Sequence, residues 1–497
     1  MADQTDSNTN SNIVRDAKID NLNYFKAKGI NPYPATFKPS DKADTLHETY
    51  KDLTDGAITE DVVIVAGRIT AYRNSGMFID LMDTSGKIQI FCHKQDLSAD
   101  ILEDISHLDL GDIVGVKGYV RRTPRAELTI NAQEVTLLTK SIQPMPDKYH
   151  GLNDIEQRYR QRYIDLIANE DSRRVFHQRA QIIRAMRRVL DDKGYLEAET
   201  PVLHPIAGGA AARPFTTHHN ALDMQLYLRI ATELYLKRLV VGGLAEGVYE
   251  FGRTFRNEGI SIKHNPEFTM LEAYVVYNDY TDMMALVENL IESACIAIHG
   301  KPVAMFGDKA LNFAAPWPRK SMCELVHEKT AIDFMQITDR EKAKAEAERL
   351  GIKVEPHFNW GEIVEAVFAE KVEHTLIQPI HVIHQPKDIS PLAKPCPENP
   401  IITERFESFA NGWEIANAFS ELNDPFDQRA RFEDQVDKRD RGNDEATEMD
   451  EDFVIALEYG MPPTGGLGIG IDRLIMLLTD SHSIRDVIAF PTMRKIH

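Results

Sequence analysis

The chain has 497 residues, of which 43% are hydrophobic and 27% charged, and it carries a formal net charge of −20. This is the composition of a globular protein, so bulk disorder, collagen and coiled coil are excluded, and the length predicts two or three domains. The acidic balance excludes a uniformly basic nucleic-acid binder and leaves any RNA contact to local positive patches.

The N-terminal region divides into a polar start and a helical segment. Residues 1–12 are polar, lack the basic and apolar regions of a secretory signal, and are expected to be disordered. Residues 13–60 are expected to lead into the first domain through a helix that Gly29 ends. No apolar run approaches the roughly 18 residues of a membrane span, so no membrane partner is expected. The four cysteines form no CxxC pair, which suits a reducing compartment, and we expect the cytoplasm.

Residues 61–139 read as a small β-domain. Five short segments rich in β-branched residues are separated by Gly, Asp and Pro turns, and a helical stretch lies between the third and the fourth. A five-stranded barrel of the OB type fits this pattern, while a small sandwich or an SH3-like barrel is the alternative. Residues 140–153 form a Pro-containing linker, and residues 154–497 alternate helical and strand patterns without a βαβ rhythm. The fold class predicted is therefore α+β.

Nine arginines fall between Arg158 and Arg188. The simpler interpretation is a set of helices whose arginines pair with acidic neighbours. The stretch is nevertheless a candidate positive patch for RNA, together with Arg121, Arg122 and Arg125 of the small domain.

The first of three chemical constellations spans residues 249–277 and reads as strand, loop, strand. Its loop holds Arg256, Glu258 and His264, and Phe268 follows. Arginine offers a planar fork to an oxyanion, and an aromatic ring can stack on a nucleobase. An ordinary charged hairpin loop is the alternative.

The second constellation is TGGLGIGIDRLIMLLTD, residues 464–480. Glycines at alternate positions of a strand allow close approach of a ligand or of another backbone, and the following helix N-terminus, with Arg473 in its first turn, favours anions. The spacing is not the GxGxxG of a dinucleotide fold. Glycines needed only for packing remain the alternative.

The third constellation surrounds an Asn411-Gly412 turn. Glu407 and Glu414 flank this turn and can face each other across a hairpin, where a cation such as Mg²⁺ would relieve their repulsion. A surface acidic hairpin is the alternative.

Together these stretches resemble the class II aminoacyl-tRNA synthetases. FRNEGISIKHNPEFTMLEAY resembles motif 2 of that class, GLGIGIDRLIMLL its motif 3, and GYLEAETPVL its motif 1. Further stretches, among them ELYLKRLVVGG, ISPLAK and NAFSELNDP, resemble the lysine-specific, bacterial-type branch, and SGKIQIF and LGDIVGVKG resemble its anticodon-binding OB domain. The resemblance implies an OB-fold barrel followed by a catalytic domain with an antiparallel sheet flanked by helices. It also implies ATP-dependent ligation of L-lysine to tRNA(Lys) through a lysyl-adenylate, by a homodimer joined through the motif 1 region.

The resemblance also implies roles in an ATP site. Arg256 and Arg473 would be catalytic, the first clamping the α-phosphate and the second touching the γ-phosphate. Glu407 and Glu414 would hold Mg²⁺. The ATP-binding residues carried over are Arg256, Glu258, His264, Phe268, Glu407, Glu414 and Arg473.

The amino-acid pocket of the family falls on seven residues: Gly209, Glu233, Glu272, Tyr274, Asn417, Phe419 and Glu421. The chemistry of lysine asks for such a set, because a buried ammonium needs several acceptors. Glu233 and Glu421 would face the ε-ammonium and Glu272 the α-ammonium. In the barrel, Phe78, Gln89 and Glu127 match positions that contact anticodon bases.

Three alternatives remain. A relative that lysylates protein would lack the OB domain. An aspartate- or asparagine-specific synthetase would need a cation or an amide in place of the acidic cluster. A non-enzymatic RNA-binding protein would have no reason to keep Arg256, Glu258, Glu414 and Arg473 together.

Overall fold

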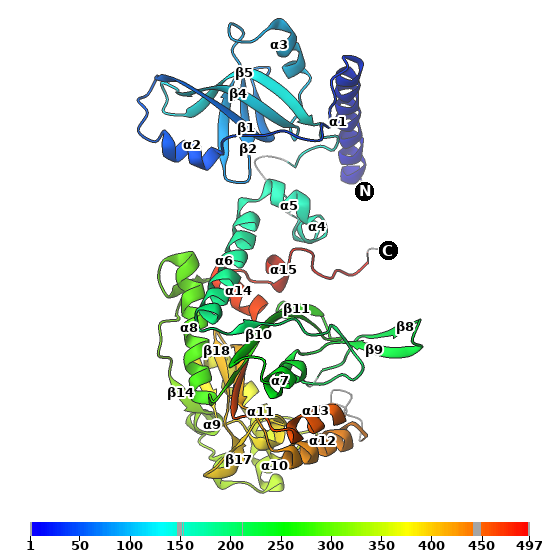
Figure 1. Cartoon of the computed structure of the whole chain (residues 1–497), viewed down its shortest axis with the longest axis vertical. Coiled ribbons are helices and arrows are strands. Elements are labelled where there is room, and N and C mark those ends of the chain that lie inside the picture. Colours follow the sequence, from blue (N-terminus) through cyan, green and yellow to red (C-terminus); the bar gives the residue numbers. More distant parts are fainter. Residues whose placement is uncertain (1, 147–151, 153, 211, 441–448, 496–497) are drawn as a thin grey trace. The chain divides into compact units, whose positions relative to one another are not determined.

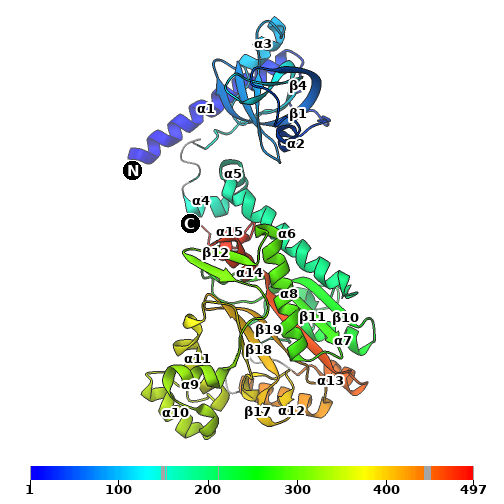
Figure 2. The same cartoon turned by 90° about the vertical axis from the view of Figure 1, so that its left-hand side faces the viewer.

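The computed structural model describes residues 2–146, 152, 154–210, 212–440 and 449–495. The chain forms two compact units, Met1–Asn153 and Asp154–His497. Figures 1 and 2 show both units from two directions. Within the described ranges, no helix is long and apolar enough to cross a membrane.

The first unit is built around a closed barrel with the strand order β1-β2-β3-β5-β4. Alternate residues of β1, such as Val63, Val65 and Ile69, are buried in the barrel core, as the two-residue period of a strand requires. The predicted OB-type barrel is thus confirmed. Its elements are α1 (Ala2–Ala27), α2 (Ala43–Thr49), β1 (Ile58–Arg73), β2 (Phe78–Met82), β3 (Lys87–Phe91), α3 (Ala99–Ser106), β4 (Ile113–Arg122) and β5 (Leu128–Thr139).

The first helix is longer than the sequence suggests. It begins at Ala2 rather than near Ile13, so it includes most of the range 1–12 that we expected to be disordered. Extending an existing helix costs far less than nucleating one, so polar residues can continue the turns of the apolar segment behind them. The helix ends at Ala27, and Gly29 follows with a positive φ of 77°, as the sequence indicates.

The second unit contains most of the helices. They are α4 (Ile155–Arg160), α5 (Arg162–Ala168), α6 (Glu170–Asp192), α7 (Glu233–Val241), α8 (Tyr280–His299), α9 (Met322–Thr330), α10 (Arg340–Arg349), α11 (Trp360–Lys371), α12 (Pro425–Asp440), α13 (Glu451–Glu458), α14 (Ile471–Thr479) and α15 (Ile484–Val487). Three 3₁₀ turns cover Phe334–Gln336, Glu373–Thr375 and Lys387–Ile389.

An eight-stranded sheet with the order β14-β15-β18-β19-β20-β11-β10-β6 is the centre of this unit. The six inner strands pair antiparallel, as expected, whereas β14 and β6 at the two edges pair parallel with their neighbours. The strands are β6 (Leu196–Glu197), β10 (Gly247–Phe255), β11 (Glu267–Val276), β14 (Arg319–Ser321), β15 (Ile380–Ile383), β18 (Arg405–Ala410), β19 (Trp413–Ser420) and β20 (Thr464–Gly470).

Helices cover the sheet on both faces. The main core joins apolar residues of α6, α8 and α14 to the sheet, and Figure 2 shows α8 lying along it. A second core packs α7, α12 and α13 against Val248 of β10 and Tyr274 of β11. The cavity described below is built where α7 meets the inner strands.

The remaining strands form small sheets at the periphery. In Figure 1 the β8–β9 hairpin extends away from the central sheet. The strands are β7 (Leu203–His204), β8 (Thr216–His219), β9 (Met224–Leu228), β12 (Val303–Phe306), β13 (Lys309–Asn312), β16 (Pro395–Cys396) and β17 (Asn399–Thr403). Helices α9, α10 and α11 share a core with residues of β15 and with Phe409 of β18, so the charged stretch around α10 belongs to a folded region.

The arginine-rich stretch is largely neutralised by contacts within the chain. Arg162 is fully buried and pairs with Asp165 at 2.6 Å, and Arg179 binds Asp472 at 2.5 Å. Arg187 pairs with Glu197 at 2.9 Å. Helix-supporting ion pairs, the simpler interpretation of this stretch, therefore describe most of it better than a positive RNA-binding patch.

Candidate functional site

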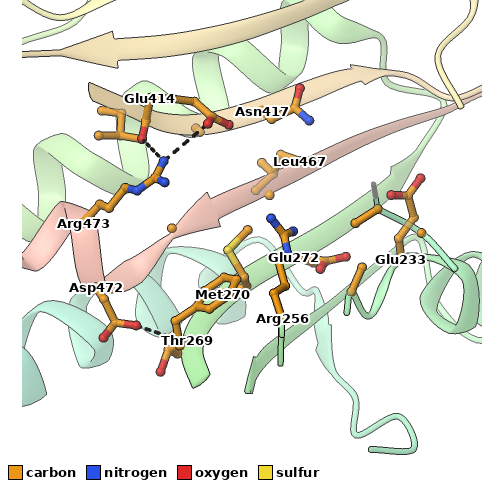
Figure 3. Close-up of a pocket in the computed structure, with 18 of the residues that line it drawn as sticks. Glu233, Arg256, Thr269, Met270, Glu272, Glu414, Asn417, Leu467, Asp472 and Arg473 are labelled. Carbon is orange, nitrogen blue, oxygen red and sulfur yellow. Dashed lines mark hydrogen bonds and ion pairs between the residues drawn. The ribbon is translucent and has the colours of Figure 1, made fainter. Parts of the chain in front are cut away.

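A cavity of about 320 Å³ opens between α7 and the inner strands of the sheet. Its walls come from β11, β19 and β20, from the loop between β10 and β11, and from the start of α14. Figure 3 shows Arg473 and Glu414 at one end of this cavity, Glu233 at the other, and Arg256 and Glu272 between them. The cavity therefore has a cationic half and an acidic half.

The structure brings together all the candidate residues of the second unit except Glu407. The residues from the sequence prediction that line the cavity are Gly209, Glu233, Arg256, Glu258, His264, Phe268, Glu272, Tyr274, Glu414, Asn417, Phe419, Glu421 and Arg473.

In the cationic half, Arg256 follows β10 and lies over the ring of Phe268, with its guanidinium carbon 5.2 Å from the ring centroid. Among the described residues its buried Nε has no hydrogen-bond partner. Burial lowers the pKa of the Arg256 guanidinium, but an arginine remains charged at neutral pH. The cavity thus offers an unsatisfied planar cation to an anionic ligand.

Arg473, in the first turn of α14, joins two of the predicted residues. One terminal nitrogen donates to the backbone oxygen of Glu414 at 3.1 Å, and the other donates to Nε2 of His264 at 3.0 Å. Burial, with Arg473 nearby, lowers the pKa of His264. His264 is therefore neutral, with its proton on Nδ1 facing the Ser261 hydroxyl at 2.7 Å.

Asp472 fixes the start of α14 against the sheet. One carboxylate oxygen accepts from the backbone N–H of Thr269 in β11 at 2.6 Å, and the other accepts from Arg179 of α6 at 2.5 Å. Figure 3 shows the contact with Thr269. Because Arg473 is the next residue, these bonds determine where its guanidinium lies. The sequence analysis did not single out Asp472.

Glu407 differs from the sequence interpretation. The turn at Asn411-Gly412 pairs Phe409, rather than Glu407, with Glu414, and a bulge between Ser408 and Phe409 shifts the register by one more residue, so Glu407 lies opposite Asn417. Glu407 binds Arg405 at 2.7 Å and is absent from the cavity wall. Burial raises its pKa to about 8, Arg405 opposes that rise, and Glu414 adds to it. The two carboxylates thus influence each other, but they do not face each other directly.

The acidic half is formed by β11, α7 and the end of β19. Glu272 accepts from the backbone N–H of Thr232 at 3.0 Å and from the Tyr274 hydroxyl at 3.1 Å. Burial raises the pKa of Glu272, and Glu233 raises it further. Glu421 is buried, and its Oε1 has no hydrogen-bond partner within the described part of the chain. A buried carboxylate oxygen without a donor predicts that the ligand supplies a hydrogen-bond donor here.

The alternating glycines of β20 make room for these acceptors. A Cβ added at Gly466 would lie 1.9 Å from Oε1 of Glu421 and 2.7 Å from the Tyr274 ring. At Gly468 the nearest atom would be 3.4 Å away. Close approach of a side chain, rather than helix packing alone, therefore explains Gly466.

One basic residue of this half was missed by the sequence analysis. Lys237 of α7 is fully buried, and its ammonium forms ion pairs with Glu233 and Glu421. Its only sequence signal is the Glu-x-x-x-Lys spacing of ELYLK, which places the two side chains on the same side of a helix.

On the barrel, the three predicted residues lie on or beside neighbouring strands. Phe78 of β2 pairs with Phe91 of β3, with ring centroids 4.9 Å apart, and Arg121 lies over Phe91 at 5.1 Å. Gln89 accepts from the Thr129 hydroxyl at 3.0 Å, and Glu127 is exposed just before β5. Half-buried aromatic rings beside a cation form a surface on which bases can stack.

Comparisons with known proteins agree over both units. The family model of class II tRNA synthetases (D, K and N) matches residues 154–494, and that of the OB-fold nucleic acid binding domain matches residues 63–138. A lysine–tRNA ligase of Sinorhizobium medicae is 52% identical over 494 residues, covering 99% of each chain. Lysine–tRNA ligases of Lysinibacillus sphaericus and Carboxydothermus hydrogenoformans are 53% and 52% identical, and these matches cover 94% and 96% of this chain and 94% and 97% of the relatives.

Proposed function

The chain belongs to the class II aminoacyl-tRNA synthetases, in the family of the lysine–tRNA ligases, and from this membership we propose that it ligates L-lysine to tRNA(Lys) with ATP. The observation that carries the choice of lysine is the acidic half of the cavity, where Glu233, Glu272 and Glu421 surround buried space beside Tyr274. A site built to hydrogen-bond a substrate group rejects analogues that lack it by about 10⁴-fold or more.

The reaction has two steps. The carboxylate of lysine attacks the α-phosphorus of ATP, a P–O bond forms, and the bond to pyrophosphate breaks to leave lysyl-adenylate. The 3′-terminal ribose hydroxyl of tRNA then attacks the acyl carbonyl, and AMP leaves. Because a carboxylate is already a nucleophile, the first step needs positioning and charge neutralisation rather than a general base.

The cationic half supplies those needs. We assign the α-phosphate and the reacting carboxylate to Arg256, whose free Nε and planar head suit an oxyanion. Arg473 would contact the γ-phosphate with neutral His264 beside it, since both already meet at the open end of the cavity. Phe268 would stack on adenine and Glu258 would accept from its amino group.

At the acidic half, Glu272 and the backbone at Gly209 would bind the α-ammonium, and Glu233, Glu421 and Tyr274 the ε-ammonium. Asn417 and Phe419 also line the cavity wall. This arrangement holds the carboxylate of lysine towards Arg256, where it can attack ATP.

Glu407 and Glu414 fit a role in holding Mg²⁺. Their oxygen donors suit a hard cation, and burial raises the pKa of Glu407 to about 8 although Arg405 opposes that rise, so a bound cation would help to keep this carboxylate ionised. A bound Mg²⁺ would neutralise charge on the phosphates. Within the described residues, no group of three or more potential ligands forms a site by protein atoms alone, so ATP oxygens and water would complete the coordination.

For tRNA, we assign anticodon contacts to Phe78, Gln89 and Glu127 on the barrel, with Phe91 and Arg121 as additional neighbours. A homodimer through the motif 1 region is supported by the exposed apolar side chains of Leu196, Val202 and Leu203 beside the sheet edge at β6. We propose a cytoplasmic location, which the substrates ATP and tRNA support.

Amino-acid-dependent ATP–pyrophosphate exchange tests this function. The purified chain should exchange with lysine and not with aspartate or asparagine. Exchange driven by aspartate would overturn the assignment. Aminoacylation of tRNA(Lys), with no lysine transferred to protein, would separate the proposal from the protein-lysylating alternative.

A further inference from the structure

A lysine of the chain itself lies behind the acidic half of the cavity, against the carboxylates of Glu233 and Glu421 that line it. The side chain of Lys237 has no solvent exposure. Its ammonium contacts Glu233 at 2.5 Å and also pairs with Glu421. Burying a charge of this kind is costly unless it is paired, so both partners are required to keep it in place.

Three elements build this arrangement. Glu233 lies one turn before Lys237 on α7, Glu421 follows β19, and aromatic rings close the remaining sides. The ammonium lies 5.4 Å from the ring centroid of Phe419 and 5.7 Å from that of Tyr274. Phe453 of α13 is at 5.8 Å. The amine therefore cannot move far without losing a carboxylate or entering a ring.

The charges of the acidic half balance only when Lys237 is counted. Glu233, Glu272 and Glu421 supply three carboxylates, and Lys237 supplies one ammonium. The α- and ε-ammonium groups of a bound lysine would supply the other two. Oε1 of Glu421, which has no hydrogen-bond partner in the described structure, marks where acceptor capacity is left for the substrate.

We propose that Lys237 is a positioning residue for lysine recognition, because its ammonium binds the carboxylates of Glu233 and Glu421 from behind the cavity wall and directs their remaining oxygens to the place where the substrate ε-ammonium can bind. This inference rests on the proposed function and deepens it. Lys237 acts through the two carboxylates and would not itself touch the reacting atoms.

The physical reason is the coupling of buried carboxylates. Burial raises the pKa of Glu421 well above its ordinary value, Lys237 lowers it, and Glu233 and Glu272 raise it again. Burial alone would lower the pKa of Lys237, but Glu233 and Glu421 outweigh burial and raise it, so the amine stays charged. The groups that face this amine are Glu233 from α7, Tyr274 from β11 and Glu421 beyond β19, with Glu272 of β11 next to them.

Without this amine, the carboxyl group of Glu421 would lose the neighbour that lowers its pKa and would be protonated more readily. A protonated carboxyl offers fewer acceptors, so lysine binding would require proton release. The pH below which lysine affinity falls would then move upward. An opposite charge at 4–6 Å changes a carboxyl pKa by about 1–3 units, and this sets the expected displacement.

The experiment measures the KM for lysine in ATP–pyrophosphate exchange from about pH 6 to pH 8.5. This range is wide enough to detect a change of about 1–3 units in a carboxyl pKa. We compare wild type with Lys237→Met, which keeps the length of the side chain and removes its charge. The midpoint of the KM increase should move upward by about 1–3 pH units in Lys237→Met. It should return towards wild type in Lys237→Arg, while the KM for ATP stays unchanged. If the Met variant does not fold, Lys237→Gln provides the same loss of charge.

Arg238→Met is the matched control. Arg238 is the next residue of α7, but its guanidinium pairs with Asp450 and Asp452 outside the main cavity. Arg238→Met should therefore leave the pH midpoint of the increase in the KM for lysine unchanged. A folded Lys237→Met variant with an unshifted midpoint would overturn the inference, even if that variant melts earlier. Absence of lysine-dependent exchange in wild type would instead overturn the proposed function.

Discussion

Glu421 is the residue whose conservative substitution tests the acidic half most directly. Glu421→Gln keeps the shape of the side chain but replaces one oxygen with an NH₂ donor. In the structure this carboxylate is buried, and its Oε1 has no hydrogen-bond partner among the described residues. The amide would present either a donor to the substrate ammonium, which has only donors, or a weaker neutral acceptor.

The magnitude follows from the kind of hydrogen bond that is lost. A hydrogen bond to a charged group contributes about 1.5–3 kcal/mol, and each 1.36 kcal/mol is a tenfold change. The KM for lysine should therefore rise about 10- to 150-fold. The KM for ATP should change little, because the nucleotide end is formed by Arg256, Phe268 and Arg473 at the other end of the cavity.

The assay is ATP–pyrophosphate exchange with lysine and ATP varied in turn. Glu451→Gln serves as a control, since Glu451 is an exposed partner of Arg429 outside the cavity and should leave both constants unchanged. Equal increases in both KM values for Glu421→Gln would refute the placement of Glu421 at the lysine side chain.

Three further substitutions test other parts of the molecule. Gly466→Ala should raise the KM for lysine at least tenfold, because its Cβ would lie 1.9 Å from Glu421 Oε1. Gly468→Ala is the control: its Cβ would lie 3.4 Å from the nearest atom, so it should have a much smaller effect in the same exchange assay. Phe78→Ala should reduce tRNA aminoacylation about 5- to 150-fold, in line with about 1–3 kcal/mol per stacked base, and leave exchange intact. Loss of both activities would make the ring a core residue of the barrel. Asp472→Asn should lower the free energy of unfolding by about 1–3 kcal/mol and reduce the rate of exchange, because one of the two buried hydrogen bonds of Asp472 must be lost. Melting curves and exchange rates equal to those of wild type would contradict the role of Asp472 in positioning Arg473.

The sequence predicted much of the fold because local patterns and global structure agree. The two-residue periods of the barrel strands, the glycines of β20 and the loop between β10 and β11 all occur where expected. The cavity residues were foreseen because their chemistry is carried by short contiguous motifs. Arg256 and Phe268 belong to one short segment of the sequence, and Gly466 and Arg473 belong to another.

The features that were missed depend on tertiary context. The two-residue turn already pairs Glu414 with Phe409 rather than with Glu407, and a bulge that nothing in the sequence around Ser408 marks increases the offset of Glu407 by one residue. Lys237 was overlooked because lysines are almost never fully buried unless paired, and Glu421, half of its pair, is far away in the chain. The partners of the arginines in α6, such as Asp472 for Arg179, are likewise remote in sequence.

The position of β20 has a consequence for how the enzyme is made. This strand comes last in sequence, yet it lies between β11 and β19 at the middle of the sheet. During synthesis on the ribosome, the inner edges of β11 and β19 remain unpaired until residues 464–470 have been synthesised. Unpaired edges are templates for association with other chains, so nascent and prematurely terminated chains should be clients for chaperones. Neither ATP nor lysine could stabilise such a chain, because a wall of the cavity is still missing.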